Sequence, residues 1–290
     1  DNNPQSTDQV ARAPYLTQFL AEPYYGPMPE VTVISNGRMF KAFGSRAFLR
    51  PQWSVLNTLQ AFNAYNGTLL WQRSLDPDFM IHRNTIIATP DTLYLADATS
   101  CKLLDAATGE LKDEIKVPEE LSDGPVWKWM ALDAGVLYAL VGEKEPPGDA
   151  LKGPGFRGAG WPWWKIDQYA WGFGRTILAI DPASKKVLWQ HPETEPLDTR
   201  AMCLKGERLF FYSHRKFLGC LNTKTGETVW RTDEPAVLDA IGEHHPAQFP
   251  ATGFATSAYA KCSEDAIYFA GPTRTKLVAV SAKDGKLLWQ

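Results

Sequence analysis

The amino-acid sequence predicts an all-β protein built from repeated four-stranded antiparallel sheets. The first observation is a short motif in which a polar residue is followed by Gly four positions later and by Trp eight positions later. The second is the alternation of apolar and polar residues on both sides of each motif, as expected for half-buried strands. The three complete copies are Asn63, Gly67 and Trp71; Asn222, Gly226 and Trp230; and Ser281, Gly285 and Trp289.

Two further copies of the motif each lack one of its members. The copy that begins at Asp105 has Asp113 at the position of the Trp. The copy that begins at Asp181 has Lys185 at the position of the Gly. Five copies in one register indicate an internal repeat, whereas the alternative interpretation is five unrelated hairpins.

Each member of the motif has a physical reason to be there. The polar side chain bonds the backbone of a tight turn, and Gly supplies the positive φ that such a turn requires. The Trp ends the outer strand, where its large flat ring covers the join to the next unit. The motif therefore predicts the turn between the third and fourth strands of each sheet.

From residue 31 onward we expect five units, each with four strands that we name A to D in chain order. Strand B carries an aromatic-containing apolar run, such as Phe210-Phe211-Tyr212. Sheets of this kind, repeated about every 40 residues, indicate the blades of a β-propeller. The predicted strands are 31–35, 38–43, 58–62 and 68–73; 85–89, 92–96, 102–105 and 110–115; 127–132, 136–141, 176–180 and 186–190; 201–204, 208–212, 218–221 and 227–232; and 257–262, 266–270, 277–280 and 286–289.

These strands divide the chain into an extension and a propeller. Residues 1–30 are rich in Pro, Asn and Gln, and a strand at 15–20 is a candidate for closing a ring. Residues 31–290 form the expected propeller. Its predicted blades span about 31–75, 85–116, 126–191, 200–232 and 256–290.

The segment Leu277-Val-Ala-Val-Ser-Ala-Lys-Asp-Gly-Lys-Leu-Leu-Trp289 resembles the tryptophan-docking repeat of pyrroloquinoline-quinone-type β-propellers. The resemblance covers roughly residues 30–290 and is specific for fold rather than activity. It implies a periplasmic or secreted location and a ring of seven or eight blades, of which five are visible. A closed ring of five blades is the alternative. The family holds quinoprotein alcohol dehydrogenases and also scaffolds, such as the propeller lipoprotein of the outer-membrane barrel assembly machine.

Composition excludes several classes of function. The chain has 290 residues, of which 44% are hydrophobic and 22% charged, as in ordinary globular proteins. A net charge of −3 gives no electrostatic reason to expect nucleic acid. No apolar run is long enough for a transmembrane helix. The chain begins at Asp1 rather than Met, so we expect that it has been processed, trimmed or excerpted.

The cysteines carry no recognisable metal or haem motif. Neither CxxC nor CxxCH occurs, and the vicinal Cys pair of several quinoprotein dehydrogenases is absent. We therefore interpret the thiols as small buried apolar groups rather than ligands, and their spacing assigns no disulfide pairing. These residues are Cys101, Cys203, Cys220 and Cys262.

The predicted long connections all lie on one face. In an antiparallel four-stranded blade, the A–B and C–D turns share one face, while the B–C and D-to-A connections share the other. The long connections 44–57, 142–175 and 233–256 are all of the second kind. Long loops on a rigid scaffold are usually functional, so we expect the binding surface on this face.

The connection 142–175 carries the strongest site signal, because aromatic residues are interspersed with glycines there. These rings are candidates for an aromatic platform that binds a sugar, a quinone or a partner's side chain, with nearby cations for anionic groups. The alternative is that the rings pack on one another. The candidate ligand-binding residues are Trp161, Trp163, Trp164, Tyr169, Trp171 and Arg175, with Arg157 and Lys165 beside them.

Two smaller clusters are also candidates. His82 and Arg83 precede an inner strand, where Arg83 is a candidate for binding a carboxylate or a quinone acid group. His214 with either His244 or His245, plus Glu243, is a candidate divalent metal site, and Arg215 lies beside His214 in the sequence. Solvated polar loop residues are the preferred interpretation, so no metal site is assigned.

Two functions are consistent with these features. The first is an extracytoplasmic propeller that binds a ligand, a glycan or a protein partner on the long-connection face. The alternative is a quinoprotein-type oxidoreductase that uses pyrroloquinoline quinone with Ca²⁺, or the propeller portion of a larger enzyme. No Glu, Asn and Asp set for such a metal is recognisable as a motif, and no catalytic residue is assigned.

Overall fold

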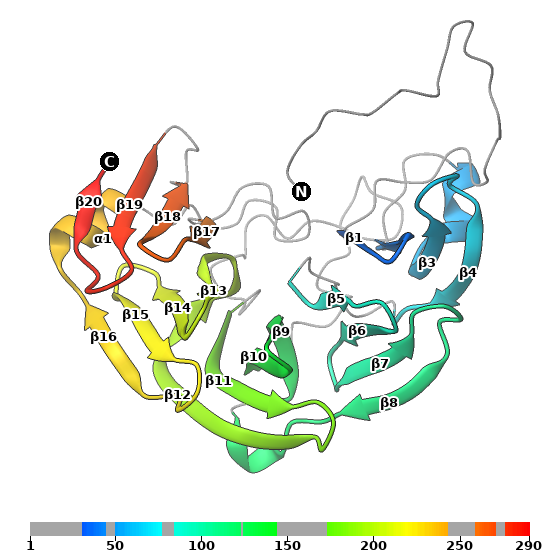
Figure 1. Cartoon of the computed structure of the whole chain (residues 1–290), viewed down its shortest axis with the longest axis horizontal. Coiled ribbons are helices and arrows are strands. Elements are labelled where there is room, and N and C mark those ends of the chain that lie inside the picture. The colour runs from blue at the N-terminus through cyan, green and yellow to red at the C-terminus, as the bar shows by residue number, and fades with distance from the viewer. Residues whose placement is uncertain are drawn as a thin grey trace, which may run out of the picture.

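Five four-stranded antiparallel sheets are arranged in an arc, as the computed structural model shows (Figure 1). The structure describes residues 31–44, 50–76, 84–122, 124–143, 173–242, 259–270 and 276–290. In every sheet the strands follow one another in chain order, and the first strand of each sheet lies at the inner edge of the arc (Figure 1). This arrangement confirms the predicted blades of a β-propeller.

The strand bounds agree closely with the predicted elements. Sheet 1 contains β1 (Val31–Ser35), β2 (Arg38–Phe43), β3 (Thr58–Asn63) and β4 (Leu69–Ser74). Sheet 2 contains β5 (Ile86–Ala88), β6 (Thr92–Ala96), β7 (Cys101–Asp105) and β8 (Leu111–Ile115). Sheet 3 contains β9 (Val126–Asp133), β10 (Val136–Gly142), β11 (Phe173–Asp181) and β12 (Lys186–Asp198). Sheet 4 contains β13 (Cys203–Lys205), β14 (Arg208–Ser213), β15 (Phe217–Asn222) and β16 (Thr228–Thr232), and sheet 5 contains β17 (Tyr259–Cys262), β18 (Ala266–Ala270), β19 (Leu277–Ser281) and β20 (Leu287–Trp289).

Three boundaries correct the expectations from sequence. Ala201 lies in the short 3-10 helix η5 (Thr199–Ala201) rather than in a strand, because the side chain of Asp198 accepts a hydrogen bond from the backbone of Arg200 and caps that turn. Strand β12 continues to Asp198, eight residues beyond its expected end at 190. Arg175 belongs to β11 and not to the long connection before it.

Helical segments also lie in two connections that were expected to be irregular. The 3-10 helix η1 (Arg50–Val55) precedes β3, and the helix α1 (Pro235–Ile241) follows β16. Pro235 suits the first turn of α1 because its missing N–H would have no partner there. Val237, Ala240 and Ile241 of this helix pack into the core between sheets 4 and 5.

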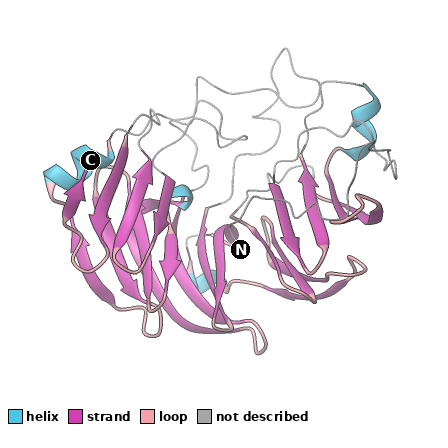
Figure 2. Cartoon of the chain, turned by 45° about the horizontal axis from the view of Figure 1, so that its top comes forward, coloured by secondary structure: helices cyan, strands magenta, loops and turns pink. Residues whose placement is uncertain are grey.

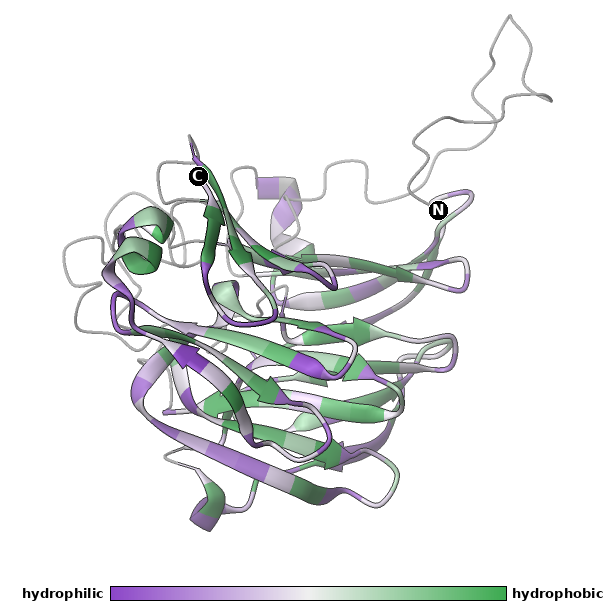
Figure 3. Ribbon diagram, turned by 60° about the vertical axis from the view of Figure 1, so that its left-hand side comes forward, coloured by the Kyte–Doolittle hydropathy of each residue, from purple (hydrophilic) through white to green (hydrophobic). Residues whose placement is uncertain are grey.

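The core is divided into four clusters, one between each pair of neighbouring sheets. Phe40 and Leu93 are buried together between sheets 1 and 2, and Trp127 and Leu178 belong to the cluster between sheets 2 and 3. Phe211 joins sheets 3 and 4, and Phe269 joins sheets 4 and 5. Figure 3 shows apolar residues along the strands and polar residues at their turns. Burial of apolar area between consecutive sheets therefore holds the arc together.

The turn motif forms as predicted. Asn63 Oδ1 accepts hydrogen bonds from the backbone N–H groups of Tyr65 and Asn66 at 2.9 and 3.3 Å. Gly67 has a φ of 71° and donates its N–H to the Asn63 carbonyl at 2.8 Å. The turn that begins at Asp105 has the same arrangement, so side-chain capping and a left-handed Gly together define the repeat.

The tryptophans dock on the turn of the next sheet. The indole Nε1 of Trp71 donates to the carbonyl of Ala106 at 3.2 Å, and a methyl group at Gly109 would lie 2.6 Å from the ring. Trp189 donates to the Thr223 carbonyl at 2.8 Å and covers Gly226 in the same way. At the third such junction, Trp230 donates to Ala282 and covers Gly285. The Gly of the motif thus serves both the turn and the close approach of the indole.

A β-bulge recurs in the outer strand of all five sheets, one residue before the position of the Trp. In sheet 1, for example, Ala61 pairs with Trp71 and Phe62 with Leu69, so Leu70 is the extra residue. Bulges increase the local twist and redirect the strand. The extra residues are Leu70, Lys112, Leu188, Val229 and Leu288, and the four apolar ones are exposed.

Candidate binding site on the long-connection face

The longest connections between strands all lie at the same end of the sheets. We call the end with the A–B and C–D turns the turn face and the opposite end the long-connection face. Figure 2 shows the short turns together along the lower edge of the sheets. On the turn face the strand bounds leave connections such as 36–37, 64–68 and 134–135; on the long-connection face they leave 44–57, 143–172 and 233–258.

Of the candidate ligand-binding residues, only Arg175 lies in the part of the chain that the structure describes. Trp161, Trp163, Trp164, Tyr169 and Trp171, with His82 and Arg83, fall outside it, as do Arg157 and Lys165, so their proposed roles stay predictions.

Arg175 lies near the start of β11, on the long-connection face. Its Nη1 is 3.4 Å from Glu143 Oε1, and both side chains are well exposed. The backbone approaches closely here, since a methyl group at Gly174 would lie 2.4 Å from the Val141 carbonyl oxygen. Arg175 therefore stands at the base of the connection whose aromatic residues the sequence singled out.

A hydrogen bond at the inner edge of the arc links sheets that are not neighbours. Asn84, just before β5 of sheet 2, donates its side-chain Nδ2 to the carbonyl of Thr199 before β13 of sheet 4, at 2.9 Å. The carbonyl of Asn84 accepts the backbone N–H of Met130 in the intervening β9 at 2.7 Å. Asn84 thus links the segments that precede β5 and β13 to the middle of β9.

A buried ion pair adjoins this bond. Arg200 donates from Nε to Asp198 Oδ1 at 2.7 Å and from Nη2 to Asp198 Oδ2 at 3.2 Å, while the Arg200 guanidinium lies 5.3 Å from the centre of the Phe173 ring. Asp198 is fully buried. Two parallel bonds orient the guanidinium, and such pre-organised groups are typical of sites that recognise planar anions.

Lys128 is the second buried cation at this end of the inner edge. Leu140 pairs with Trp129 and Val141 pairs with Trp127, so Lys128 is the extra residue of a bulge in β9. Its side chain is fully buried. Lysine is rarely buried in full unless it is paired, and bulges are frequent beside functional sites because they re-aim a side chain. No sequence pattern points to this residue, since a bulge is visible only in the strand pairing.

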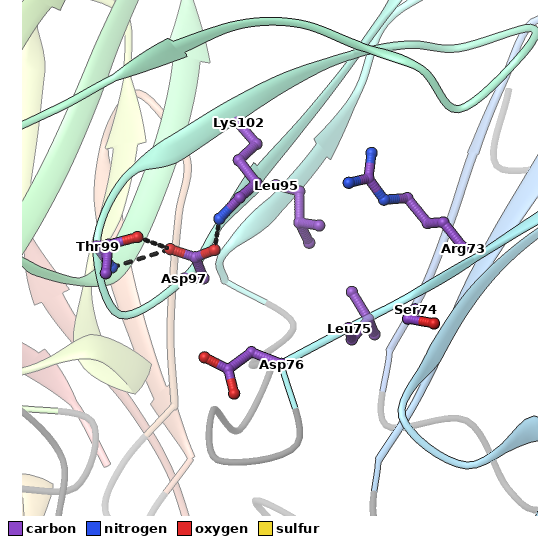
Figure 4. A pocket seen from close by; sticks show the side chains of 8 residues that line it. All are labelled: Arg73, Ser74, Leu75, Asp76, Leu95, Asp97, Thr99 and Lys102. Atoms are coloured by element: carbon purple, nitrogen blue, oxygen red, sulfur yellow. Dashed lines mark hydrogen bonds and ion pairs between the residues drawn. The ribbon is translucent and has the colours of Figure 1, made fainter.

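A pocket of about 200 Å³ opens between sheets 1 and 2 (Figure 4). Arg73 and Lys102 contribute cations, while Asp76 and Asp97 contribute carboxylates. Lys102 forms an ion pair with Asp97, and Asp97 also accepts hydrogen bonds from Thr99 (Figure 4). Arg73 donates to the Gly109 carbonyl at 2.8 Å. Burial lowers the pKa of both Arg73 and Lys102.

Neither a metal site nor a membrane-spanning helix is found in the described ranges. Within them, no group of three or more His, Cys, Asp or Glu side chains is placed to hold a metal ion. His214 packs edge-on against Tyr212, whose hydroxyl accepts the backbone N–H of Arg215. Glu243 and the two histidines after it lie outside the described residues, so that metal hypothesis stays a prediction. No described helix is long and apolar enough to cross a membrane.

Comparison with known proteins agrees with the fold and the repeat. The sequence model of the family described as outer membrane protein assembly factor BamB matches residues 174–242. Over 79 residues the chain is 37% identical to the quinoprotein alcohol dehydrogenase PedH of Pseudomonas putida, covering 27% of this chain and 13% of that protein. Over 136 residues it is 29% identical to a quinoprotein ethanol dehydrogenase of Pseudomonas putida, covering 42% of this chain and 20% of that protein.

Among solved structures, BamB from Moraxella catarrhalis superposes with a TM-score of 0.51 at 11% identity. The superposition covers 89% of this chain and 62% of that one. The chain thus spans less than two thirds of that structure, and its matched segments span a fifth or less of the two dehydrogenases.

The docked tryptophans and the radially arranged sheets define a tryptophan-docking β-propeller. Within that class, segments of the chain are similar to pyrroloquinoline-quinone-like propellers, through the BamB family model over residues 174–242 and the two quinoprotein dehydrogenases.

Proposed function

We propose that this propeller is an extracytoplasmic binding module that engages a protein partner through its long-connection face. The observation that carries the proposal is the coincidence of two features at one end of the sheets. The long connections attach there, and so do the Asn84 bond, the Asp198–Arg200 pair and buried Lys128.

The physical argument concerns rigidity. Function concentrates on loops that a rigid scaffold positions. Asn84 links the segments before β5 and β13 to the middle of β9, and the Asp198–Arg200 pair orders the turn that leads from β12 to β13. The turn face has only tight turns, which leave little chain for a specific surface. The match of residues 174–242 to the family of an outer membrane protein assembly factor supports a protein as the partner.

The test compares two lysines of sheet 4 that lie on opposite faces. Lys216 is in the β14–β15 connection on the long-connection face, and Lys224 is in the β15–β16 turn; both are exposed. A photoreactive residue would be placed at each position in turn, in the native source. We expect a discrete protein adduct from position 216 that excess unlabelled chain suppresses, and no adduct from position 224. Equal labelling from both faces would refute the proposal, and labelling by glycan or small ligand at 216 would replace the protein partner.

The named relatives favour one alternative, a quinoprotein-type oxidoreductase. Lys128 and Arg200 are cations that suit the acid groups of pyrroloquinoline quinone. The metal that accompanies this cofactor needs several oxygen ligands, and the described part of the chain places no such carboxylate group. Asp198, the acid of the cluster described here, already bonds Arg200 through both oxygens. The described residues therefore fit the cofactor's acid groups but not its metal, and we derive no reaction step from it.

Titration with pyrroloquinoline quinone in the presence of Ca²⁺ separates the two functions. Uptake is measured by the absorbance of the quinone. For a binding module we expect no saturable uptake. Uptake of one quinone per chain that requires Ca²⁺ would favour the oxidoreductase.

A further inference from the structure

Two of the four thiols meet across the junction between sheets 4 and 5. Cys203 is the first residue of the inner strand β13, and Cys262 is the last residue of the inner strand β17. These strands are neighbours at the inner edge of the arc (Figure 1). The two side chains pack in the same apolar cluster and share a thiol hydrogen bond. They are 59 positions apart in sequence, so only the fold brings them together.

The four thiols differ in environment. Cys101 and Cys220 are fully buried, and burial raises the pKa of both, that of Cys220 to about 12. Cys262 is partly exposed, and the hydrogen bond from Cys203, with Lys205 and Lys261 nearby, lowers its pKa. The thiolate is the reactive form of cysteine, so Cys262 is the most nucleophilic of these thiols.

We propose that Cys203 and Cys262 are a dithiol that forms a disulfide between the inner strands of sheets 4 and 5. The oxidant is a small-molecule or protein disulfide. This modification is independent of any partner on the long-connection face.

The chemistry is two successive thiol–disulfide exchanges. The Cys262 thiolate attacks one sulfur of the oxidant, whose S–S bond breaks to release the first thiolate and leave a mixed disulfide on Cys262. The Cys203 sulfur, after losing its proton, attacks Cys262 Sγ and releases the second thiolate. The two protein protons end on the two released thiolates, so the protein loses two electrons and the oxidant gains them.

The roles of the two residues are distinct because their exposure differs. Cys262 is reached from solvent, whereas Cys203 is buried and is raised in pKa by its hydrogen bond to Cys262 and by burial. Cys262 is therefore the attacking thiol and Cys203 the resolving thiol. The resulting bond would close a loop of 60 residues, from 203 to 262, and restrict the unfolded chain.

The test treats the reduced 290-residue chain with oxidised glutathione, then unfolds it, alkylates free thiols and maps peptides by mass spectrometry. We expect a Cys203–Cys262 cross-link, with Cys101 and Cys220 alkylated. Cys203→Ser should hold one glutathione on Cys262, whereas Cys262→Ser should take up none at Cys203. The Cys220→Ser variant is the matched control, since it keeps the cross-link.

A second measurement guards against variants that fail to fold. The wild-type chain should melt higher after oxidation than after reduction, by roughly 5–10 °C for a loop of this length. Four free thiols after excess oxidant, or a cross-link that joins Cys220 or Cys101, would overturn the proposal.

Discussion

Lys185 Nζ lies 2.5 Å from Asp113 Oδ1, and this ion pair joins the two positions at which the repeat departs from its motif. Asp113 stands where sheet 2 lacks the docking Trp, and Lys185 stands where sheet 3 lacks the turn Gly. At the other three junctions an indole covers a Gly at these positions. The two departures are therefore one exchange, in which a charged pair replaces an aromatic contact. The hydrogen bond from Lys185 also lowers the pKa of Asp113.

Restoring the aromatic contact at this junction should stabilise the protein only when both positions change. In the Asp113→Trp variant, the indole would meet the Lys185 side chain, because even a methyl group fails to fit beneath the docked rings elsewhere. In Asp113→Trp with Lys185→Gly, the ring gains its space and the φ of 61° at residue 185 is relieved. We expect the double variant to unfold at a higher urea concentration than either single variant. If the change in unfolding free energy of the double variant equalled the sum of the changes in the two single variants, the two positions would be independent and this interpretation would be wrong.

Gly226→Ala should destabilise the protein more than Gly206→Ala. Both glycines have positive φ, at 72° and 57°, so both substitutions carry the backbone strain of about 1–2 kcal/mol. A methyl group at Gly226 would also lie 2.6 Å from the Trp189 ring, whereas nothing lies within 4 Å at Gly206. Overpacking adds about 1–3 kcal/mol, so we expect a total loss of about 2–5 kcal/mol for Gly226→Ala. Urea unfolding of both variants measures the difference, and equal losses would exclude a packing role for this Gly.

Trp127→Phe should change stability by less than about 1 kcal/mol, whereas Trp127→Ala should cost about 3–5 kcal/mol. The side chain is fully buried, and its Nε1 has no hydrogen-bond partner within the described part of the chain. Phe removes that unsatisfied donor, whose burial costs about 1–3 kcal/mol, and this gain offsets the smaller ring. Thermal and urea unfolding of the two variants provide the measurement. A large loss for Phe would show that the indole N–H is bonded after all.

Protonation of Glu193, at the junction between sheets 3 and 4, should lower the stability of the protein at acidic pH. Burial opposes ionisation of Glu193, but hydrogen bonds from His191 and Arg231 outweigh it and lower the pKa below the usual 4.5. Arg231 Nη1 lies 3.0 and 3.1 Å from the two carboxylate oxygens, and His191 Nε2 lies 3.1 Å from one of them. Because the folded pKa is depressed, this contribution is present above pH 4.5 and is lost as the pH falls through the folded pKa.

The Glu193→Gln variant tests this contribution. It should be less stable than the wild type at pH 7, and its unfolding free energy should decline less steeply below pH 4.5. Glu207→Gln is a matched control, because Glu207 pairs with Lys224 on the exposed surface and should contribute little. If the unfolding free energies of Glu193→Gln and of the wild type fell equally steeply below pH 4.5, Glu193 would not be the source of the acid sensitivity.

The repeated parts of the fold could be predicted from sequence because their signals are local. The polar residue and Gly of each turn define the register of strands C and D, and the aromatic runs locate strand B. The strands 31–35, 38–43, 92–96 and 266–270 were predicted at the bounds that the structure shows.

Where the prediction stopped short, the deciding contact was not local. The predicted strand ends at residue 190, yet β12 continues through Pro192 and Pro196. It is an outer edge strand, on which proline is tolerated because the missing donor faces away from the sheet. Pro235 is a local signal for the start of α1, within a connection that is otherwise expected to be irregular.

The candidate site illustrates the same limit. The aromatic residues of 142–175 were visible by composition, and they lie outside the described residues. Lys128, Asn84 and the Asp198–Arg200 pair were missed, because each depends on strand pairing or on a contact between distant residues. Asn84 and Thr199, for instance, are 115 positions apart.

The division of the core into four clusters between consecutive sheets has a consequence for how the protein diversifies. The stability of such a repeat protein is approximately the sum of the stability of each sheet and the interaction energy between each pair of neighbouring sheets. A change at one junction therefore leaves the energies of the other junctions nearly unchanged. Sequence drift can then be absorbed one junction at a time, with each free to adopt its own chemistry. The ion pair between Asp113 and Lys185 lies between two junctions that have a docked indole, so one chain already combines two kinds of junction chemistry.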